Sequence, residues 1–159
     1  MRALIAAAAA GNPEAQFNLG VMYDNRIDDQ GNTASPTDDN GYTISSNRAE
    51  AMRWLQRAAE QGLTRAQARL AELYAGGTDE PETRIKACKW FTLARANSSG
   101  FRLERVQAGY DRICARMTDA QVNTARRRAR RWELDHPKIP AAPPKRRASS
   151  PVRQAGVMT

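Results

Sequence analysis

Apolar residues recur at helical spacing through the first hundred residues of the chain. Ala15, Leu19 and Tyr23 follow one another at intervals of four residues. A second stripe has the spacing i, i+3, i+4, i+7, at Ala51, Trp54, Leu55 and Ala58. Because an α-helix turns once every 3.6 residues, either spacing gathers its apolar side chains on one face. The pattern therefore predicts two amphipathic helices.

Both stripes occur a second time. The first recurs 51 residues later, at Ala66, Leu70 and Tyr74, and the second recurs 36 residues later, at Ala87, Trp90, Phe91 and Ala94. The difference of 15 residues indicates an insertion between the two helices of the first copy. One helix pair cannot bury its own stripe, so neighbouring pairs must stack to form a continuous core. The repeat predicts an all-α solenoid.

The repeat also predicts where its second helices begin. Asn47 and Thr83 lie 36 residues apart, each four residues before the repeated Ala51 or Ala87. Side-chain oxygens of Asn and Thr can accept a free backbone N–H of a first helical turn. Both residues are therefore predicted to be N-caps.

Two segments carry a resemblance to a known family. Residues 15–23 read AQFNLGVMY and residues 51–62 read AMRWLQRAAEQG. Over about residues 13 to 100 the chain resembles the Sel1-like repeat, a relative of the tetratricopeptide repeat. Ala71 stands where the family pattern has Gly, which implies a slightly wider helix contact. The resemblance implies an α/α solenoid of helix-turn-helix repeats that binds other proteins and does no chemistry.

The resemblance and the spacing together divide the chain. We expect a half repeat, a first repeat with an inserted loop, a second repeat, a divergent C-terminal cap and a disordered, basic, Pro-rich tail. Their respective bounds are 1–12, 13–62 with the loop at about 25–46, 63–100, 101–136 and 137–159. The tail has too few large apolar residues to offset the entropy of ordering it.

Residues 1–10 have two interpretations. Ala-rich and followed by Gly11, they match the second helix of a preceding repeat, but they also match a signal peptide with Arg2 as its basic region. The apolar stretch is short and carries one charge, which favours the helix. Two cysteines, Cys88 and Cys114, make no disulfide framework and are expected to be small buried hydrophobes. We therefore expect a cytoplasmic protein, with a periplasmic or secreted one as the alternative.

The cap is predicted to contain two helices. The first has an apolar stripe at Leu103, Val106, Tyr110 and Ile113, and the second at Val122, Ala125, Ala129 and Trp132. Thr118 and Gln121 match a capping box, in which each side chain satisfies the other residue's free N–H. The last helix should end near His136. This ending resembles that of many bacterial members of the family, which implies a bacterial source.

Positive charge is concentrated in the cap and the tail. Residues 1–100 carry 11 Lys/Arg and 12 Asp/Glu, whereas residues 101–159 carry 14 and 5. The last helix contributes an arginine cluster of Arg126, Arg127, Arg128, Arg130 and Arg131. Such a patch can bind the phosphates of nucleic acid or an anionic membrane. The alternative is the solvated outer face of a capping helix, which the lack of neighbouring aromatic residues favours.

The sequence lacks the residue sets of the common catalytic and metal-binding sites. His136 is the only histidine, so no multi-histidine metal site or Ser/His system can form. The insertion is acidic, but Pro36 and Asn47 occupy the first and twelfth positions of the calcium loop that Asp38 and Asn40 suggest. We expect no cofactor, no metal, no small-molecule substrate and no enzymatic activity. Whether the insertion is functional or disordered stays open.

The resemblance implies that the first helix of each pair lines a concave surface. In the first copy the positions away from the apolar stripe include Glu14, Asn18 and Val21. Their equivalents 51 residues later are Arg65, Arg69 and Glu72. These six residues are the predicted contacts for a protein partner, which would dock as an extended or helical peptide.

Overall fold

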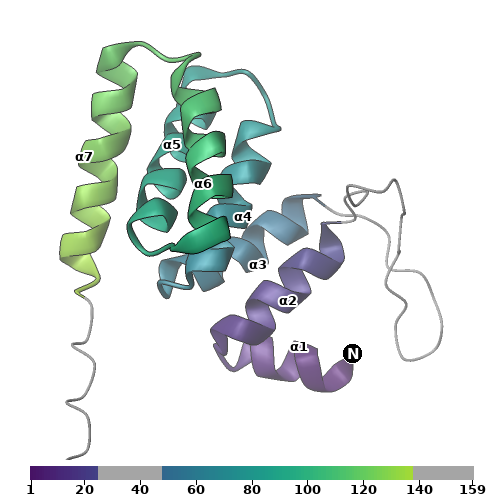
Figure 1. Ribbon diagram of the computed structural model, residues 1–159. Helices are drawn as coiled ribbons and strands as arrows, with labels where there is room; N and C mark the ends of the chain where they lie inside the picture. Colours follow the sequence, from purple (N-terminus) through teal and green to yellow (C-terminus); the bar gives the residue numbers. More distant parts are fainter. Residues whose placement is uncertain (25–47, 138–159) are drawn as a thin grey trace, which may run out of the picture.

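The computed structural model describes residues 1–24 and 48–137, which form seven helices and no strand (Figure 1). The helices are α1 (Arg2–Ala9), α2 (Pro13–Tyr23), α3 (Arg48–Glu60), α4 (Thr64–Ala75), α5 (Pro81–Ala96), α6 (Gly100–Cys114) and α7 (Asp119–Asp135). The predicted insertion at 25–46, the predicted cap at Asn47 and the tail beyond Pro137 lie outside the described residues.

The helices stack in chain order. From α1 to α6 each helix packs against the next one, and α7 turns back to pack against α5. The repeated stripes supply the core: Leu55 and Leu70 are fully buried, and Phe91 is nearly so. The repeated alanines fill the space between these large side chains, so the helices approach closely. The prediction of an all-α solenoid is confirmed.

Two turns between helices repeat one geometry. Gly11 and Gly62 lie 51 residues apart and have φ values of 95° and 84°. Their amides donate to the carbonyl oxygens of Ala8 and Ala59 at 3.1 and 2.9 Å. Glycine adopts a positive φ at no steric cost, so it ends a helix in this way more readily than other residues. The α1–α2 and α3–α4 turns are therefore structural equivalents.

The helices of the first repeat meet at Gly20. A Cβ placed on Gly20 would lie 2.6 Å from the Leu55 side chain, so no larger residue fits without a shift. The second repeat has Ala71 at the equivalent position, and this alanine is fully buried. The structure thus accommodates an alanine at the position where the second copy departs from the family pattern.

The prediction of Thr83 as an N-cap is wrong. Helix α5 begins at Pro81, and Glu80 is its N-cap residue, without a side-chain capping bond. Proline favours the first helical position because its φ is already helical and its missing N–H would have no partner there. Thr83 therefore lies inside the first turn, where its hydroxyl is 3.2 Å from that of Thr78.

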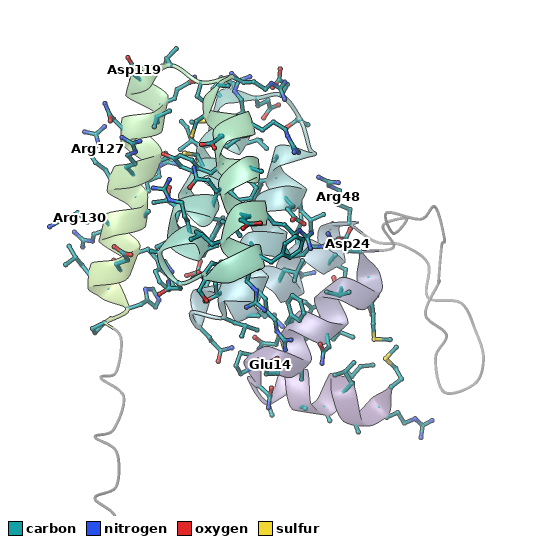
Figure 2. The ribbon with its side chains drawn as sticks, viewed as in Figure 1. Glu14, Asp24, Arg48, Asp119, Arg127 and Arg130 are labelled. Atoms are coloured by element: carbon teal, nitrogen blue, oxygen red, sulfur yellow. The ribbon has the colours of Figure 1, made fainter. Side chains whose placement is uncertain are left out.

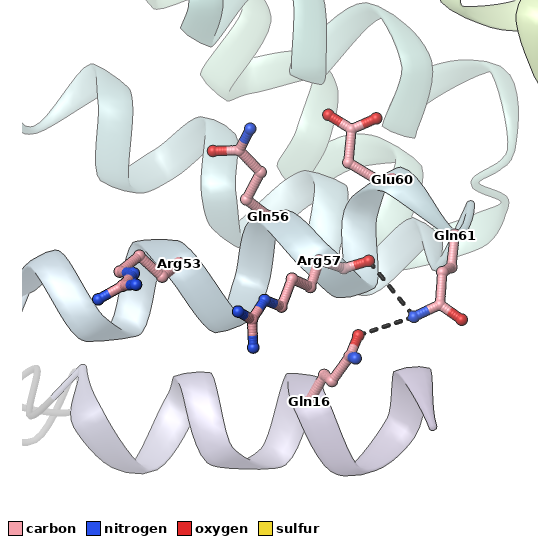
Figure 3. Close-up of a pocket in the computed structure, with 6 residues that line it drawn as sticks. All are labelled: Gln16, Arg53, Gln56, Arg57, Glu60 and Gln61. Atoms are coloured by element: carbon pink, nitrogen blue, oxygen red, sulfur yellow. Dashed lines mark hydrogen bonds between the residues drawn. The ribbon is translucent and has the colours of Figure 1, made fainter. Parts of the chain in front are cut away.

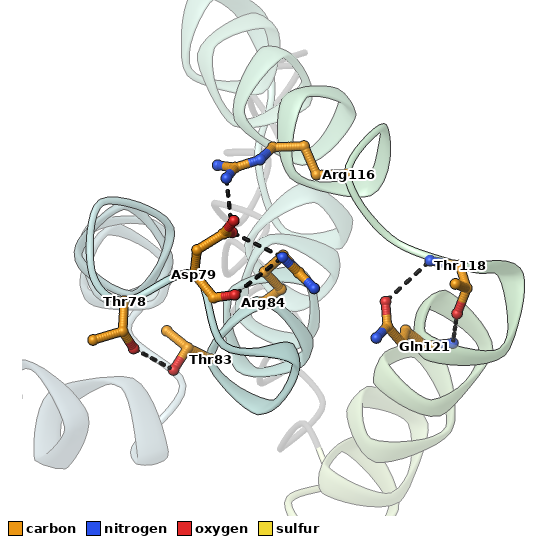
Figure 4. A network of polar contacts seen from close by, with 7 residues as sticks. All are labelled: Thr78, Asp79, Thr83, Arg84, Arg116, Thr118 and Gln121. Atoms are coloured by element: carbon orange, nitrogen blue, oxygen red, sulfur yellow. Dashed lines mark hydrogen bonds and ion pairs between the residues drawn. The ribbon is translucent and has the colours of Figure 1, made fainter.

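The cap helices form as predicted. The Thr118 backbone N–H donates to Gln121 Oε1 at 3.0 Å, and the Gln121 N–H donates to Thr118 Oγ1 at 3.3 Å (Figure 4). This capping box begins α7. The predicted cap stripes face inward to different degrees: Val106, Tyr110, Ile113, Ala125 and Ala129 are buried, while Leu103, Val122 and Trp132 are partly buried.

An exposed carboxylate joins the α4–α5 loop of the second repeat to the cap. Asp79 lies 2.8 Å from the Arg84 guanidinium and 2.7 Å from that of Arg116 (Figure 4). The hydrogen bond from Arg84, helped by the charges of both arginines, lowers the pKa of Asp79. Solvent screens these exposed pairs, so they orient the loop before α5 more than they stabilise the fold.

The two cysteines meet between α5 and α6. Their Sγ atoms lie 3.4 Å apart, and both are free thiols. Cys88 is buried and Cys114 is partly buried. Burial, with the neighbouring Cys114, raises the pKa of Cys88 to about 12. Because the thiolate is the reactive form, a protonated Cys88 is a poor nucleophile and acts as a packing residue.

Candidate partner-binding face

The first helices of the three pairs carry a row of polar and charged side chains, which we call the A-face. Helices α2, α4 and α6 supply its residues, and ion pairs join α2 to α4 and α4 to α6. The A-face consists of Glu14, Asn18, Val21 and Asp24 from α2, Arg65, Arg69 and Glu72 from α4, and Arg105 from α6. Figure 2 shows Glu14 and Asp24 at opposite ends of α2.

One end of the A-face holds a single ion pair. Arg65 contacts the Glu14 carboxylate, and its guanidinium also lies 4.5 Å from the centre of the Phe17 ring. The side chains of Arg65 and Glu14 are 40% and 52% exposed. An ion pair this open to solvent adds at most about 1 kcal/mol to stability. Both groups therefore stay accessible to a charged partner.

The other end holds a chain of four charges. Arg69 lies 2.7 Å from Asp24 and 2.9 Å from Glu72, and Arg105 lies 3.6 Å from Glu72. The side chain of Asp24 is only 6% exposed. Its carboxylate also follows the C-terminus of α2, where the helix dipole disfavours a negative charge. The Arg69 guanidinium compensates both costs, through an ion pair rather than an aligned hydrogen bond.

The two remaining predicted contacts lie on the open side of α2. Asn18 is exposed, and Val21 is 40% exposed, which is high for a large aliphatic residue. The structure thus brings four of the six predicted residues into ion pairs and leaves Asn18 and Val21 beside them. Val21 supplies an apolar contact point within a charged surface.

Three residues were not predicted: Asp24 and Arg105 of the A-face, and Phe17, which contacts Arg65. Two of them left a signal in the sequence. An aspartate after the last turn of a helix conflicts with the dipole, which indicates a nearby cation. Arg105 lies 36 residues after Arg69, so the repeat period extends to it. Phe17 gave no signal, because its contact with Arg65 depends on how α2 and α4 stack.

The arginine cluster of α7 is divided between internal contacts and solvent. Arg126 donates to the Tyr110 hydroxyl at 3.0 Å, Arg128 donates to both Glu82 oxygens at 2.5 and 3.2 Å, and Arg131 pairs with Asp135 at 3.1 Å. The hydrogen bond between Arg128 and Glu82 lowers the pKa of Glu82 and raises that of Arg128.

Two other arginines of the cluster point away from the body of the protein. Figure 2 shows Arg127 and Arg130 on the outer side of α7. Arg127 donates to the Thr124 hydroxyl one turn earlier at 3.2 Å. All five arginines of the cluster are exposed, including those that also contact other side chains of the protein.

Residues 1–24 and 48–137 contain neither a grouped set of metal ligands nor a membrane-spanning helix. Within these ranges no three His, Cys, Asp or Glu side chains are grouped so that they could hold a metal ion. No helix in the described parts has the length and apolar character needed to cross a membrane.

Comparison with known proteins identifies the repeat. A family model described as the Sel1 repeat matches residues 13–31, 39–63 and 64–99, just over half of the chain. The gap between the first two matches falls inside the predicted insertion, and the third match covers α4 and α5. No curated protein matches the sequence. The matched segments contain α2, α3, α4 and α5 and most of the A-face, and the chain belongs to the Sel1 repeat family.

Proposed function

We propose that this protein is a non-catalytic scaffold or adaptor that binds a protein partner through the A-face. Sel1 repeats generally mediate protein–protein interaction, and the chain carries them across residues 13–99. The proposal adds the surface and the mode of binding. A partner segment would lie across α2, α4 and α6, in contact with charges from all three helices.

The network around Arg69 carries this proposal. Ion pairs with a buried member stabilise a fold poorly, because removing charges from water costs about as much as their attraction returns. Apolar residues would hold α2 against α4 equally well. The chain instead keeps alternating carboxylates and guanidinium groups at Asp24, Arg69, Glu72 and Arg105. A fixed pattern of both signs selects a partner with the complementary pattern.

Charge reversal on the A-face tests the proposal. The double variant Arg65→Glu/Arg69→Glu should lose partners that the wild-type chain captures from its native host, measured by affinity capture and quantitative mass spectrometry. Arg53→Glu/Arg57→Glu is the matched control, since it makes the same charge change on α3. We expect this control to capture the wild-type set.

Two outcomes would contradict the A-face assignment. One is capture of the same partners by the A-face variant and by the wild type. The other is equal loss by both double variants, which would show an effect of net charge alone. Circular dichroism and thermal melts of both variants separate loss of binding from loss of folding, because Arg69 compensates the buried Asp24 carboxylate.

A second candidate is binding of a polyanion through α7. Its support is the outward placement of Arg127 and Arg130, together with the net positive charge of residues 101–159. Binding to DNA or to anionic vesicles should then weaken steeply as salt rises, because counterions are released on binding. Failure of the full chain to bind either polyanion at low salt would exclude this function.

A further inference from the structure

Two buried glutamines occupy equivalent positions in the two repeats. Gln16 and Gln67 lie 51 residues apart, are 4% and 0% exposed, and each follows a repeated alanine. Each side-chain nitrogen donates to a carbonyl at the end of the preceding helix, Ala8 at 3.1 Å and Ala59 at 3.3 Å. These are the same carbonyls that accept from the two turn glycines. The side-chain nitrogen of each glutamine is therefore hydrogen-bonded in the same way.

In the first repeat the side-chain oxygen of the glutamine is hydrogen-bonded as well. Gln61, the residue after α3, donates from Nε2 to the Gln16 Oε1 atom at 2.7 Å (Figure 3). The same nitrogen lies 3.5 Å from the Arg57 carbonyl oxygen in the last turn of α3. Gln61 thus spans the distance from the helix end to the buried carboxamide.

In the second repeat the corresponding bond is missing. The equivalent of Gln61, 36 residues later, is Asn97, whose side chain is one methylene shorter. Asn97 Nδ2 donates to the Leu93 carbonyl at 3.0 Å, the counterpart of the Arg57 contact. The Gln67 Oε1 atom accepts no hydrogen bond from any described residue. A buried acceptor without a donor has lost its hydration without compensation, so this oxygen favours any donor that can reach it.

Gln67, whose side chain is fully buried, is among the residues that line a cavity of about 770 Å³. The α3–α4 turn, the end of α5 and the C-terminal turn of α7 form the walls. Two carboxylates, Glu60 and Glu133, line the cavity, and its lining contains no Lys or Arg. Glu133 makes no ion pair with any described residue. The two carboxylates therefore give the cavity a negative charge.

Aromatic groups complete the wall from α7. The Trp132 indole N–H donates to Glu60 Oε2 at 2.8 Å, and the indole ring stacks on His136 with 4.3 Å between ring centres. Lys89 does not line the cavity; its ammonium group lies 4.3 Å from the centre of the Trp90 ring and interacts electrostatically with Glu60. Glu60 is thus partly compensated, and Glu133 is the uncompensated charge of the site.

We propose that this cavity binds the guanidinium group of an arginine in a peptide segment of a protein partner. A guanidinium presents five N–H donors in one plane, which suits acceptors that approach from several sides. It is also less strongly hydrated than an ammonium group and stacks on aromatic rings such as Trp132. A turn of the Gln67 side chain towards the cavity would bring its buried Oε1 atom to one of the guanidinium N–H groups and give it the donor that Asn97 does not supply. The carboxylates of Glu60 and Glu133 would compensate its charge.

This inference goes beyond the A-face proposal and does not depend on it. The cavity is lined by the ends of α3, α5 and α7, by the α3–α4 turn and by Thr64 and Gln67 of α4, and none of the A-face residues lines it. A variant that destroys one surface leaves the other in place. The two proposals can therefore fail separately.

NMR titration of the full chain tests the site. The probe is N-acetyl-arginine-N-methylamide, and its neutral counterpart is N-acetyl-citrulline-N-methylamide. We expect the arginine probe to shift the indole N–H signal of Trp132 and the side-chain amide signals of Gln67 in a saturable manner. The citrulline probe should bind at least fivefold more weakly, because it lacks the charge. Equal binding of both probes, or no saturable shift of these signals, would overturn the proposal.

Two substitutions sharpen the test without removing the buried glutamine. Asn97→Gln should supply the missing internal donor, as Gln61 does in the first repeat, and weaken arginine binding about tenfold. Glu133→Gln should weaken arginine binding at least threefold. Glu104→Gln makes the same charge change at an exposed position of α6 and should leave arginine binding unchanged. Unchanged affinity in Asn97→Gln, or equal losses in the two glutamate variants, would contradict the assigned contacts.

Discussion

The two glutamines Gln16 and Gln67 occupy the same position in the repeat and differ in one hydrogen bond. Each donates to a carbonyl oxygen, of Ala8 or Ala59, three residues before a glycine with positive φ. Only the Gln16 oxygen accepts a hydrogen bond from a neighbouring side chain. The difference follows from one methylene group between Gln61 and Asn97. It shows that a repeat can conserve its backbone frame while a single side chain at a helix end leaves a buried polar group without a partner.

Replacing each glutamine by methionine should separate the two sites most clearly. Gln16→Met removes two hydrogen bonds, so we expect a loss of about 1–3 kcal/mol in the free energy of unfolding. Gln67→Met removes one long hydrogen bond and also an unpaired buried oxygen, so the change should stay below about 1 kcal/mol. Urea denaturation measures both values. Equal losses in the two variants would mean that the two carboxamides are equally well bonded.

Exchanging the two helix-end residues should give a smaller effect of opposite sign. Gln61→Asn should destabilise the protein by about 1 kcal/mol, because Gln16 Oε1 loses its donor. Asn97→Gln should stabilise it by a similar amount, because Gln67 Oε1 gains one. The midpoints of urea unfolding at constant m-value check both changes. Two shifts of the same sign would contradict the proposed role of side-chain length.

The smallest expected effect concerns the helix that lies beside Gln67. The cavity at Gln67 is lined in part by α7, whereas the pocket at Gln16 is lined by residues of α2, α3 and the turn after α3. The Arg128 hydrogen bond, which helps to hold α7 on α5, lowers the pKa of Glu82. The folded pKa lies below the unfolded one, so this contribution is present above the unfolded pKa and is lost as pH falls through the folded pKa.

Arg128→Gln should therefore return the pKa of Glu82 towards its ordinary value and make the acid loss of stability shallower. Carboxyl NMR titration of Glu82 and thermal melts between about pH 3 and pH 6 measure this change. Arg130→Gln on the outer side of α7 is the control with the same change of charge. A Glu82 pKa that is the same in wild type and Arg128→Gln would exclude the ion pair as its cause.

The helical repeat could be read from the sequence because its signals are local. Leu55, Leu70 and Phe91 each belong to an apolar stripe of helical spacing, and they are buried as the stripes predict. The capping box at Thr118 was predicted for the same reason, since all of its atoms belong to four consecutive residues. The Thr83 prediction failed because two local signals competed, and Pro81 begins the helix earlier.

The A-face and the cavity could be predicted only in part. Glu14 and Arg65 were found as outward positions on equivalent helices, but their contact with each other depends on how α2 and α4 stack. Asp24 was missed because it follows the last turn of α2 and lies outside the apolar stripe. Trp132 was placed correctly on the packing face of α7, but its bond to Glu60 joins residues 72 positions apart.

The amino-acid sequence by itself thus determines the helices, the repeat period and the equivalence of Gln16 with Gln67. Each of these depends on spacing within one element or one period. The tertiary packing decides whether the side-chain oxygen of each glutamine has a hydrogen-bond donor. A bond between Gln61 and Gln16 spans 45 residues, and α7 reaches the cavity by turning back onto α5. Side-chain reach and helix packing act across such separations, so a difference of one methylene has its consequence only in the folded protein.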